Sequence, residues 1–371
     1  MGLHVLPTEL VYHIAKCLPH PRDVNALAKV NQRFFAILDA LLYKLEYNAQ
    51  PLSNQALLWA TRKRNTLVAR KALQYGAQLN VVGISRDCPL RFAVAQGHLP
   101  IIKLLLDHGA AIRDPMILST AAFHGFDEIV ELLLEHGASP NAKCEDKSPL
   151  IYAAEKGDER TFTLLVQRGA DIFATDCTGT SVLFYAVEGG CTTIVEKLLD
   201  LGLDTYQSDG SLGPAQAYAA RRGELDVVKL FNERGVDVDL GDEHGRTALF
   251  WAAAKGHRDM VKYLLKQGAS LEICDDWGET PALHAAIRGC TRVVKILLDH
   301  GADLECADRM GRTMLSRAAV QGLESITRLL LDRGANIETV DKDGRTPLLL
   351  AIDMRRVRTV KVLIDGGANV N

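Results

Sequence analysis

The sequence predicts an all-α solenoid of about ten stacked repeats, each made of two short helices and a projecting loop. The first observation is a Leu-Leu pair or a close relative of it, followed by a glycine, that recurs along most of the chain. The second is the spacing of these glycines, which is 33, 28 and 32 residues and then 33 residues six times. A period in this range indicates supersecondary units that stack on one another. The glycines are Gly76, Gly109, Gly137, Gly169, Gly202, Gly235, Gly268, Gly301, Gly334 and Gly367.

One period, residues 278–311, explains why each unit has this form. Thr280 is a good N-cap residue, and Pro281 follows at the first helical position, where a missing N–H costs nothing. Gly289 ends this first helix, and a second apolar-faced helix is expected from about Thr291 to His300. Helices shorter than about 12–15 residues are marginal in water, so each unit must bury its faces against the next one.

These residues carry a resemblance to the ankyrin repeat over about residues 53–371. It rests on the Gly-x-Thr-Pro segment, the Ala pair, the internal glycine and the Leu-Leu…Gly-Ala ending, all in register across about ten units. The resemblance implies an ankyrin solenoid, here assigned to residues 51–371. The His of the family's Thr-Pro-Leu-His tetrapeptide is missing, which leads us to expect a looser stack. The residues at its place are Arg91, Ile151, Phe250, Leu283, Ser316 and Leu349.

Composition and charge exclude some classes of function and indicate where the protein acts. Of the 371 residues, 47% are hydrophobic and 24% are charged, as in folded globular proteins, and the net charge of −3 disfavours a general nucleic-acid binder. No apolar run approaches a membrane span, and no signal peptide is evident. The eight cysteines form no C-x-x-C pair and suit free thiols in a reducing compartment. We therefore expect a cytoplasmic and/or nuclear protein, monomeric apart from its partners, with no cofactor and no metal.

Residues 1–50 do not follow the repeat and predict three small helices. This segment resembles an F-box through Leu6-Pro7, Glu9-Leu10, Ile14, Leu18, Asp23-Val24, Leu27, Val30, Arg33-Phe34 and Leu41-Leu42-Tyr43. An F-box followed by ankyrin repeats is similar to the arrangement in fungal F-box/ankyrin proteins. The resemblance implies that the head binds the adaptor subunit of a Skp–cullin–F-box ubiquitin ligase. The contact residues would be Leu6, Pro7, Leu10, Ile14, Leu18 and Leu27. The alternative is that these helices only cap the solenoid.

Two repeats are irregular. The 28-residue step removes most of the loop between Asp114 and Met116, and the segment Tyr206–Gln216 loses the Gly-x-Thr-Pro pattern, so a more mobile loop is expected there. Sequence drift and a shaped recognition site both explain these changes, and drift is favoured. The chain stops after Asn371 without a further helix, which leaves open whether a longer protein continues.

The sequence contains no recognised catalytic motif. It has no P-loop, no H-E-x-x-H, no G-x-S-x-G and no dinucleotide-binding fingerprint. His108, His136 and His300 precede a glycine at a helix end and are expected to interact with the negative end of the helix dipole. Asp242, Asp275, Asp341 and other loop carboxylates recur at one repeat position, which indicates turn and capping roles rather than an active site. An enzyme is therefore disfavoured.

The residue before the Ala pair is aromatic in six of the first seven repeats, and these side chains should form a row along one side of the stack. One interpretation is core packing between helices, and the other is an aromatic binding ladder. At the loop tips, Trp277 is the least expected residue, and several arginines predict a locally basic groove. The predicted protein-binding residues are Tyr152, Tyr185, Tyr218, Trp251, His244, Trp277, Arg309, Arg312, Arg317 and Arg345.

The sequence thus predicts a non-enzymatic protein-interaction module, specifically the substrate-recognition subunit of a Skp–cullin–F-box ligase. The alternative is a plain ankyrin scaffold with no link to ubiquitin.

Overall fold

The computed structural model describes residues 46–47, 50–79, 88–144, 146–204 and 213–370. Within these residues the helices are joined by turns and loops, and the two named strands are two residues long each. This confirms the all-α class. Internal contacts divide the described chain into two units. The first runs to Ala153 and includes Arg160–Asp171, and the second contains Ala154–Glu159 and everything from Ile172. The predictions for the three-helix head and for the mobile loop at 206–212 lie outside the described residues.

The first unit opens with a short hairpin in which β1 (Glu46–Tyr47) pairs antiparallel with β2 (Gln50–Pro51). Helix α4 (Leu52–Arg62) starts at the next residue. The predicted junction at Pro51 stays a prediction, since most of the residues before it lie outside the described part of the chain. The helices whose sequences begin in this part are α4 (Leu52–Arg62), α5 (Thr66–Gln74), α6 (Pro89–Ala95), α7 (Leu99–Asp107), α8 (Met116–Phe123), α9 (Asp127–Glu135), α10 (Pro149–Lys156) and α11 (Glu159–Gln167).

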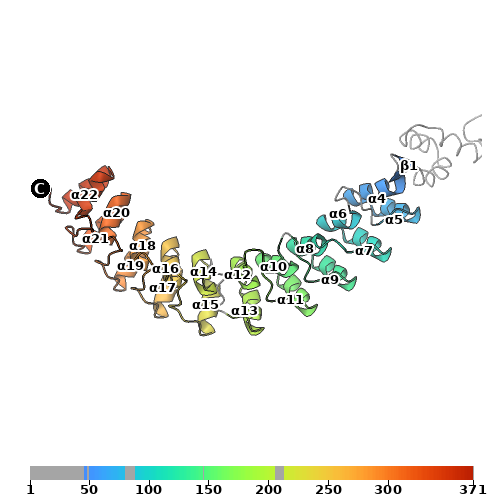
Figure 1. Cartoon of the computed structure of the whole chain (residues 1–371), viewed down its shortest axis with the longest axis horizontal. Coiled ribbons are helices and arrows are strands. Elements are labelled where there is room, and N and C mark those ends of the chain that lie inside the picture. The colour runs from blue at the N-terminus through green and yellow to red at the C-terminus, as the bar shows by residue number, and fades with distance from the viewer. Residues whose placement is uncertain (1–45, 48–49, 80–87, 145, 205–212, 371) are drawn as a thin grey trace, which may run out of the picture. The chain divides into compact units, whose positions relative to one another are not determined.

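The second unit continues the alternation of first and second helices. Its first helices α14, α16, α18, α20 and α22 follow one another in one row, and the second helices α15, α17, α19, α21 and α23 form another (Figure 1). The helices are α12 (Val182–Glu188), α13 (Thr192–Asp200), α14 (Ala215–Arg222), α15 (Leu225–Glu233), α16 (Ala248–Lys255), α17 (Arg258–Lys266), α18 (Pro281–Ile287), α19 (Thr291–Asp299), α20 (Met314–Gln321), α21 (Glu324–Asp332), α22 (Pro347–Asp353) and α23 (Val357–Asp365).

The local signals act as the sequence predicts. The Thr280 hydroxyl accepts a hydrogen bond from the Leu283 N–H at 3.3 Å, and Pro281 is the first residue of α18. The predicted second helix, α19, begins at Thr291 and ends at Asp299. The shortened third loop is also present, since α7 ends at Asp107 and α8 already begins at Met116.

Small side chains allow the first helices to approach closely. Ala252, Ala253, Ala285 and Ala286 are fully buried, so the Ala pair forms the contact between α16 and α18. At the position of the family's missing His, apolar side chains fill the space in several repeats. Ile151, Phe250 and Leu283 are all at most 1% exposed. Packing therefore replaces the hydrogen bonds that His would make at these three positions.

Helix ends are closed by one recurring device. The Nδ1 atoms of His108, His136 and His300 each lie 2.8 Å from the carbonyl oxygen four residues earlier, in the last turn of the helix. The predicted end-of-helix role of these three histidines is thereby confirmed. The glycine after each has a positive φ, +95° at Gly301.

We predict that Gly301→Ala destabilises the protein by about 1–2 kcal/mol, the cost of holding an L-residue in a left-handed conformation. A Cβ at this position would meet no atom within 4 Å, so strain is isolated from steric clash. Urea denaturation followed by circular dichroism measures the change. Gly334→Ala, with φ +85° and equally open space, is the matched variant and should give a similar loss. No loss at either position would contradict the strain argument.

Candidate functional site

The loops of the second unit are organised by one aspartate each. In five loops the Oδ1 atom of this aspartate accepts hydrogen bonds from the backbone N–H groups two and four residues later, at 2.7–3.0 Å. The predicted turn role of the recurring carboxylates is confirmed at these positions. The loop aspartates are Asp176, Asp242, Asp275, Asp308 and Asp341.

The second carboxylate oxygen of a loop aspartate is available for side chains of the neighbouring helix. Asp176 Oδ2 accepts the hydroxyl proton of Tyr185 at 2.7 Å, and Asp308 Oδ2 accepts from Arg317 Nε at 2.6 Å. Tyr185 and Arg317 both belong to the row of residues before the Ala pair, nine positions after their aspartates. These two members of the row are therefore hydrogen-bonded to the preceding loops.

Burial divides the row into structural and accessible members. Tyr185 and Tyr218 are 8% and 9% exposed, so in this repeat pair the core interpretation applies. Trp251, His284 and Arg317 are half-buried and present part of their side chains to solvent. In the first unit Tyr152 is also half-buried, and its hydroxyl donates to the Cys144 carbonyl oxygen at 3.3 Å.

Electrostatics confirm this structural role for Tyr185. Burial and the adjacent Asp176 carboxylate raise the pKa of Tyr185 well above its usual value, so the hydroxyl stays protonated and continues to donate. Burial alone would raise the pKa of Asp176, but the hydrogen bonds from Tyr185, Thr178 and Thr180 outweigh it and hold that pKa below its usual value.

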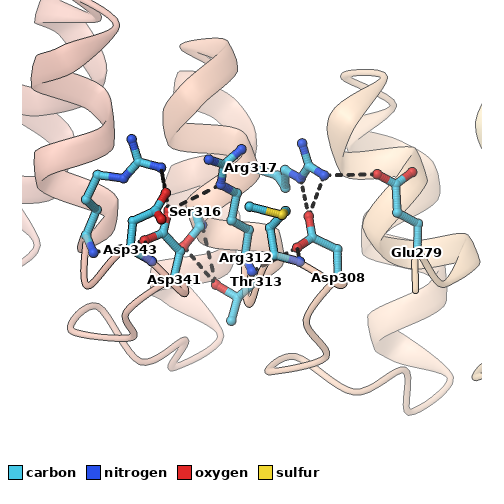
Figure 2. Close-up of polar contacts among 10 residues, drawn as sticks. Glu279, Asp308, Arg312, Thr313, Ser316, Arg317, Asp341 and Asp343 are labelled. Atoms are coloured by element: carbon cyan, nitrogen blue, oxygen red, sulfur yellow. Dashed lines mark hydrogen bonds and ion pairs between the residues drawn. The ribbon is translucent and has the colours of Figure 1, made fainter. Parts of the chain in front are cut away.

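The predicted basic groove is largely neutralised. Arg312 Nε lies 3.3 Å from Asp341 Oδ2, Arg345 Nη2 lies 3.1 Å from the same oxygen, and Arg317 Nη2 lies 3.2 Å from Glu279 Oε1 (Figure 2). Each of these three guanidinium groups faces a buried carboxylate, which balances part of the predicted positive charge. Arg309, which follows Asp308 at the tip of its loop, is exposed. A role in partner binding for these four residues stays a prediction.

A different pair of arginines surrounds Trp251. The guanidinium carbons of Arg221 and Arg246 lie 4.8 and 4.6 Å from the centroid of the Trp251 ring, close enough for cation–π attraction. Arg246 also pairs with Asp242 at 2.8 Å, whereas the exposed Arg221 guanidinium meets no carboxylate among the described residues. Sequence reasoning missed Arg221, since only the stack brings the end of α14 beside Trp251.

The loop tips form a continuous edge in this unit. The Asp276 N–H donates to the His244 carbonyl at 3.0 Å, and the Arg309 N–H donates to the Trp277 carbonyl at 2.8 Å. The His244 ring is held by Asp276 Oδ2 at 2.8 Å and lies 6.0 Å from the Trp277 ring. Trp277 remains 54% exposed, and Met310 on the next tip 45%. Two predicted binding residues, His244 and Trp277, are thus brought together.

A further cluster gathers Asp275, Glu279 and His284. His284 Nδ1 lies 2.7 Å from Glu279 Oε2, and Arg317 holds the other oxygen of Glu279. Burial raises the pKa of Asp275, and the nearby Glu279 charge adds to this, although its backbone hydrogen bonds and His284 act in the opposite direction. The sequence pattern did not predict this cluster, because it assigns Asp275 only a turn role.

The predicted adaptor-binding residues Leu6, Pro7, Leu10, Ile14, Leu18 and Leu27 lie outside the described residues. No helix in the described part of the chain is both long enough and apolar enough to cross a lipid bilayer.

Family models for ankyrin repeats match most of the chain. A family model for ankyrin repeats in three copies matches residues 118–209, 183–275, 267–341 and 306–371, and a single ankyrin-repeat model matches residues 86–118. The chain belongs to the ankyrin-repeat family. Ankyrin repeats indicate a protein–protein interaction module. No F-box model matches residues 1–85, and no curated protein matches the chain.

We predict that Asp341→Asn lowers the free energy of unfolding at neutral pH by about 1–3 kcal/mol, because Asn cannot pair with the guanidinium groups of Arg312 and Arg345. Burial opposes ionisation of Asp341, yet its hydrogen bonds from Arg345, Arg312 and Asp343 keep its pKa below the usual value.

The sign of the pH dependence follows from that depressed pKa. A carboxylate whose folded-state pKa lies below the unfolded value stabilises the fold above pH about 4 and loses this contribution as the pH falls further. Urea unfolding at several pH values should therefore show a weaker acid destabilisation in Asp341→Asn than in wild type. Parallel curves for the two proteins would contradict the assignment.

Proposed function

We propose that the second unit binds an acidic segment of a partner protein over Arg221, Trp251 and the tip residue Trp277. The observation that carries this is the Arg221–Trp251 contact, in which a guanidinium lies on an aromatic ring and no carboxylate of the described residues pairs with it. A guanidinium stacked in this way still has its N–H groups at its edge, where they bind a carboxylate in a bidentate manner. Trp and Arg are also the residues that most often dominate binding energy in protein interfaces.

Trp277 supports the same proposal from the loop edge. Its ring is held on one side by His244 and is more than half exposed, although a large apolar side chain gains nothing for folding by facing water. Ankyrin repeats generally bind proteins, and the exposed Trp gives a specific contact for such a partner.

We further propose that residues 1–50 recruit the adaptor of a Skp–cullin–F-box ligase, so that the bound partner becomes a substrate for ubiquitination. This part rests on the resemblance of the head to an F-box. The second candidate function is a scaffold that binds its partner through the same repeats without any ligase. Both candidates share the repeat surface and differ only in the head.

We predict that Trp277→Ala and Arg221→Ala each weaken capture of the partner by about tenfold or more and change the free energy of unfolding by no more than about 0.5 kcal/mol. Partners are first identified by cross-linking and mass spectrometry with the full chain, and the affinity of a purified partner is then measured. The control Lys262→Ala changes an exposed residue of a second helix and should bind as wild type. Unchanged affinity in both test variants would contradict the proposed surface.

We predict that the full chain co-purifies with a purified ligase adaptor, and that Leu10→Asp and Ile14→Asp abolish this binding because a charge replaces an apolar contact. A chain of residues 53–371 should not bind the adaptor but should keep the partner of the repeat surface. If the wild-type chain does not bind the adaptor, or if both Asp variants still do, the ligase proposal fails and the scaffold function remains.

A further inference from the structure

Within the part of the chain that the structure describes, the Asp275 carboxylate lacks a side-chain donor that its counterparts in the other loops possess. Its Oδ1 atom accepts from Trp277 and Glu279 backbone N–H groups, as in every loop of this set. Among the described residues no hydrogen-bond donor reaches Oδ2, and yet the residue is only 5% exposed.

The counterparts show what is missing. The second oxygen of the loop aspartate accepts from the Tyr185 hydroxyl at Asp176, from Arg246 at Asp242, from Arg317 at Asp308, and from Arg312 and Arg345 at Asp341. A hydroxyl or a guanidinium therefore occupies this place in the four other loops. At Asp275 no side chain of the described residues donates to this oxygen.

Two substitutions in the sequence create this difference. Four positions after the aspartate the neighbouring repeats have Arg246, Arg312 and Arg345, whereas this loop has Glu279. Nine positions after it stands His284, at the place of Tyr185 and Arg317. A cation has thus been exchanged for a second carboxylate, and an imidazole has been added beside it.

The charges of this cluster do not balance. Asp275, Glu279 and Asp308 are buried acids, and Arg317 is the cation that contacts the last two of them. The cluster therefore contains more carboxylates than guanidinium groups. A divalent cation would remove the excess.

We propose that Asp275, Glu279 and His284 form a binding site for one divalent metal ion of the zinc class. A ligand atom from each of the three side chains lies within 4.8 Å of the other two, so small side-chain rotations would bring them around a single ion. An imidazole nitrogen together with two carboxylate oxygens suits Zn²⁺, whereas Mg²⁺ and Ca²⁺ prefer oxygen ligands alone.

The neighbouring residues are arranged to support such an ion. Arg317 holds Glu279 Oε1 and is itself held by Asp308, which leaves Glu279 Oε2 facing His284. Hydrogen bonds of this kind orient metal ligands. On binding, the His284 ring proton occupies Nε2, and Nδ1 gives its lone pair to the ion in place of its contact with Glu279. The ion would join the Trp277 loop to α18.

The test is a titration of the full chain with Zn²⁺ by calorimetry and with Co²⁺ by visible absorption. All proteins carry Cys274→Ser, because the exposed thiol beside Asp275 could bind the same ions. One equivalent should bind, and Asp275→Asn and His284→Gln should each reduce the affinity by about tenfold or more. Zn²⁺ should also raise the melting temperature of the parent protein but not of these variants.

The matched control is His300→Gln, which changes an exposed histidine that contacts a helix carbonyl. It should keep the metal affinity of the parent. Asp275→Asn retains an acceptor oxygen for the two backbone N–H groups, so without metal it should melt at or above the parent temperature and remain a valid test if His284→Gln does not fold. If the parent binds neither ion, or if Asp275→Asn binds both ions as tightly as His300→Gln, the metal site is rejected.

Discussion

The second unit depends on the hydrogen bonds that two backbone N–H groups donate to the carboxylate of a loop aspartate. They close each loop just before a first helix begins, and the Thr N-cap follows a few residues later. In the loops of Asp275, Asp308 and Asp341, a backbone hydrogen bond also joins the tip to the preceding tip. Each short helix is thereby placed where it can bury its apolar face against the next repeat.

The same aspartate also gives the repeats their individual chemistry. One oxygen is used for the turn, and the other meets whatever side chains stand four and nine positions later. In one repeat this partner is Tyr185, which becomes part of the core, and in another it is Arg317, which links two loops. Where Glu279 and His284 take these positions, a buried carboxylate cluster results. A constant backbone thus carries variable sites.

The sequence could predict the register of the row and the turn role of the aspartates, since both follow from spacing alone. It could not predict which rings are buried, because that depends on the helix of the adjoining repeat. Tyr185 and Tyr218 are covered, whereas Trp251 is met by two guanidinium groups. The ion pairs of the arginines could not be predicted for the same reason, since Arg317 and Arg312 contact carboxylates from neighbouring loops.

By itself the sequence determined the repeat, the ends of its helices and the ankyrin family, because caps, glycines and apolar periodicity act over a few residues. Only the tertiary structure decided which side chains meet across repeats. Arg221 and Trp251 are separated by about one period in the chain and still touch. Among the described residues, Asp275 lacks the side-chain donor that its counterparts have. Such pairings depend on how one unit stacks on the next, and no local pattern specifies them.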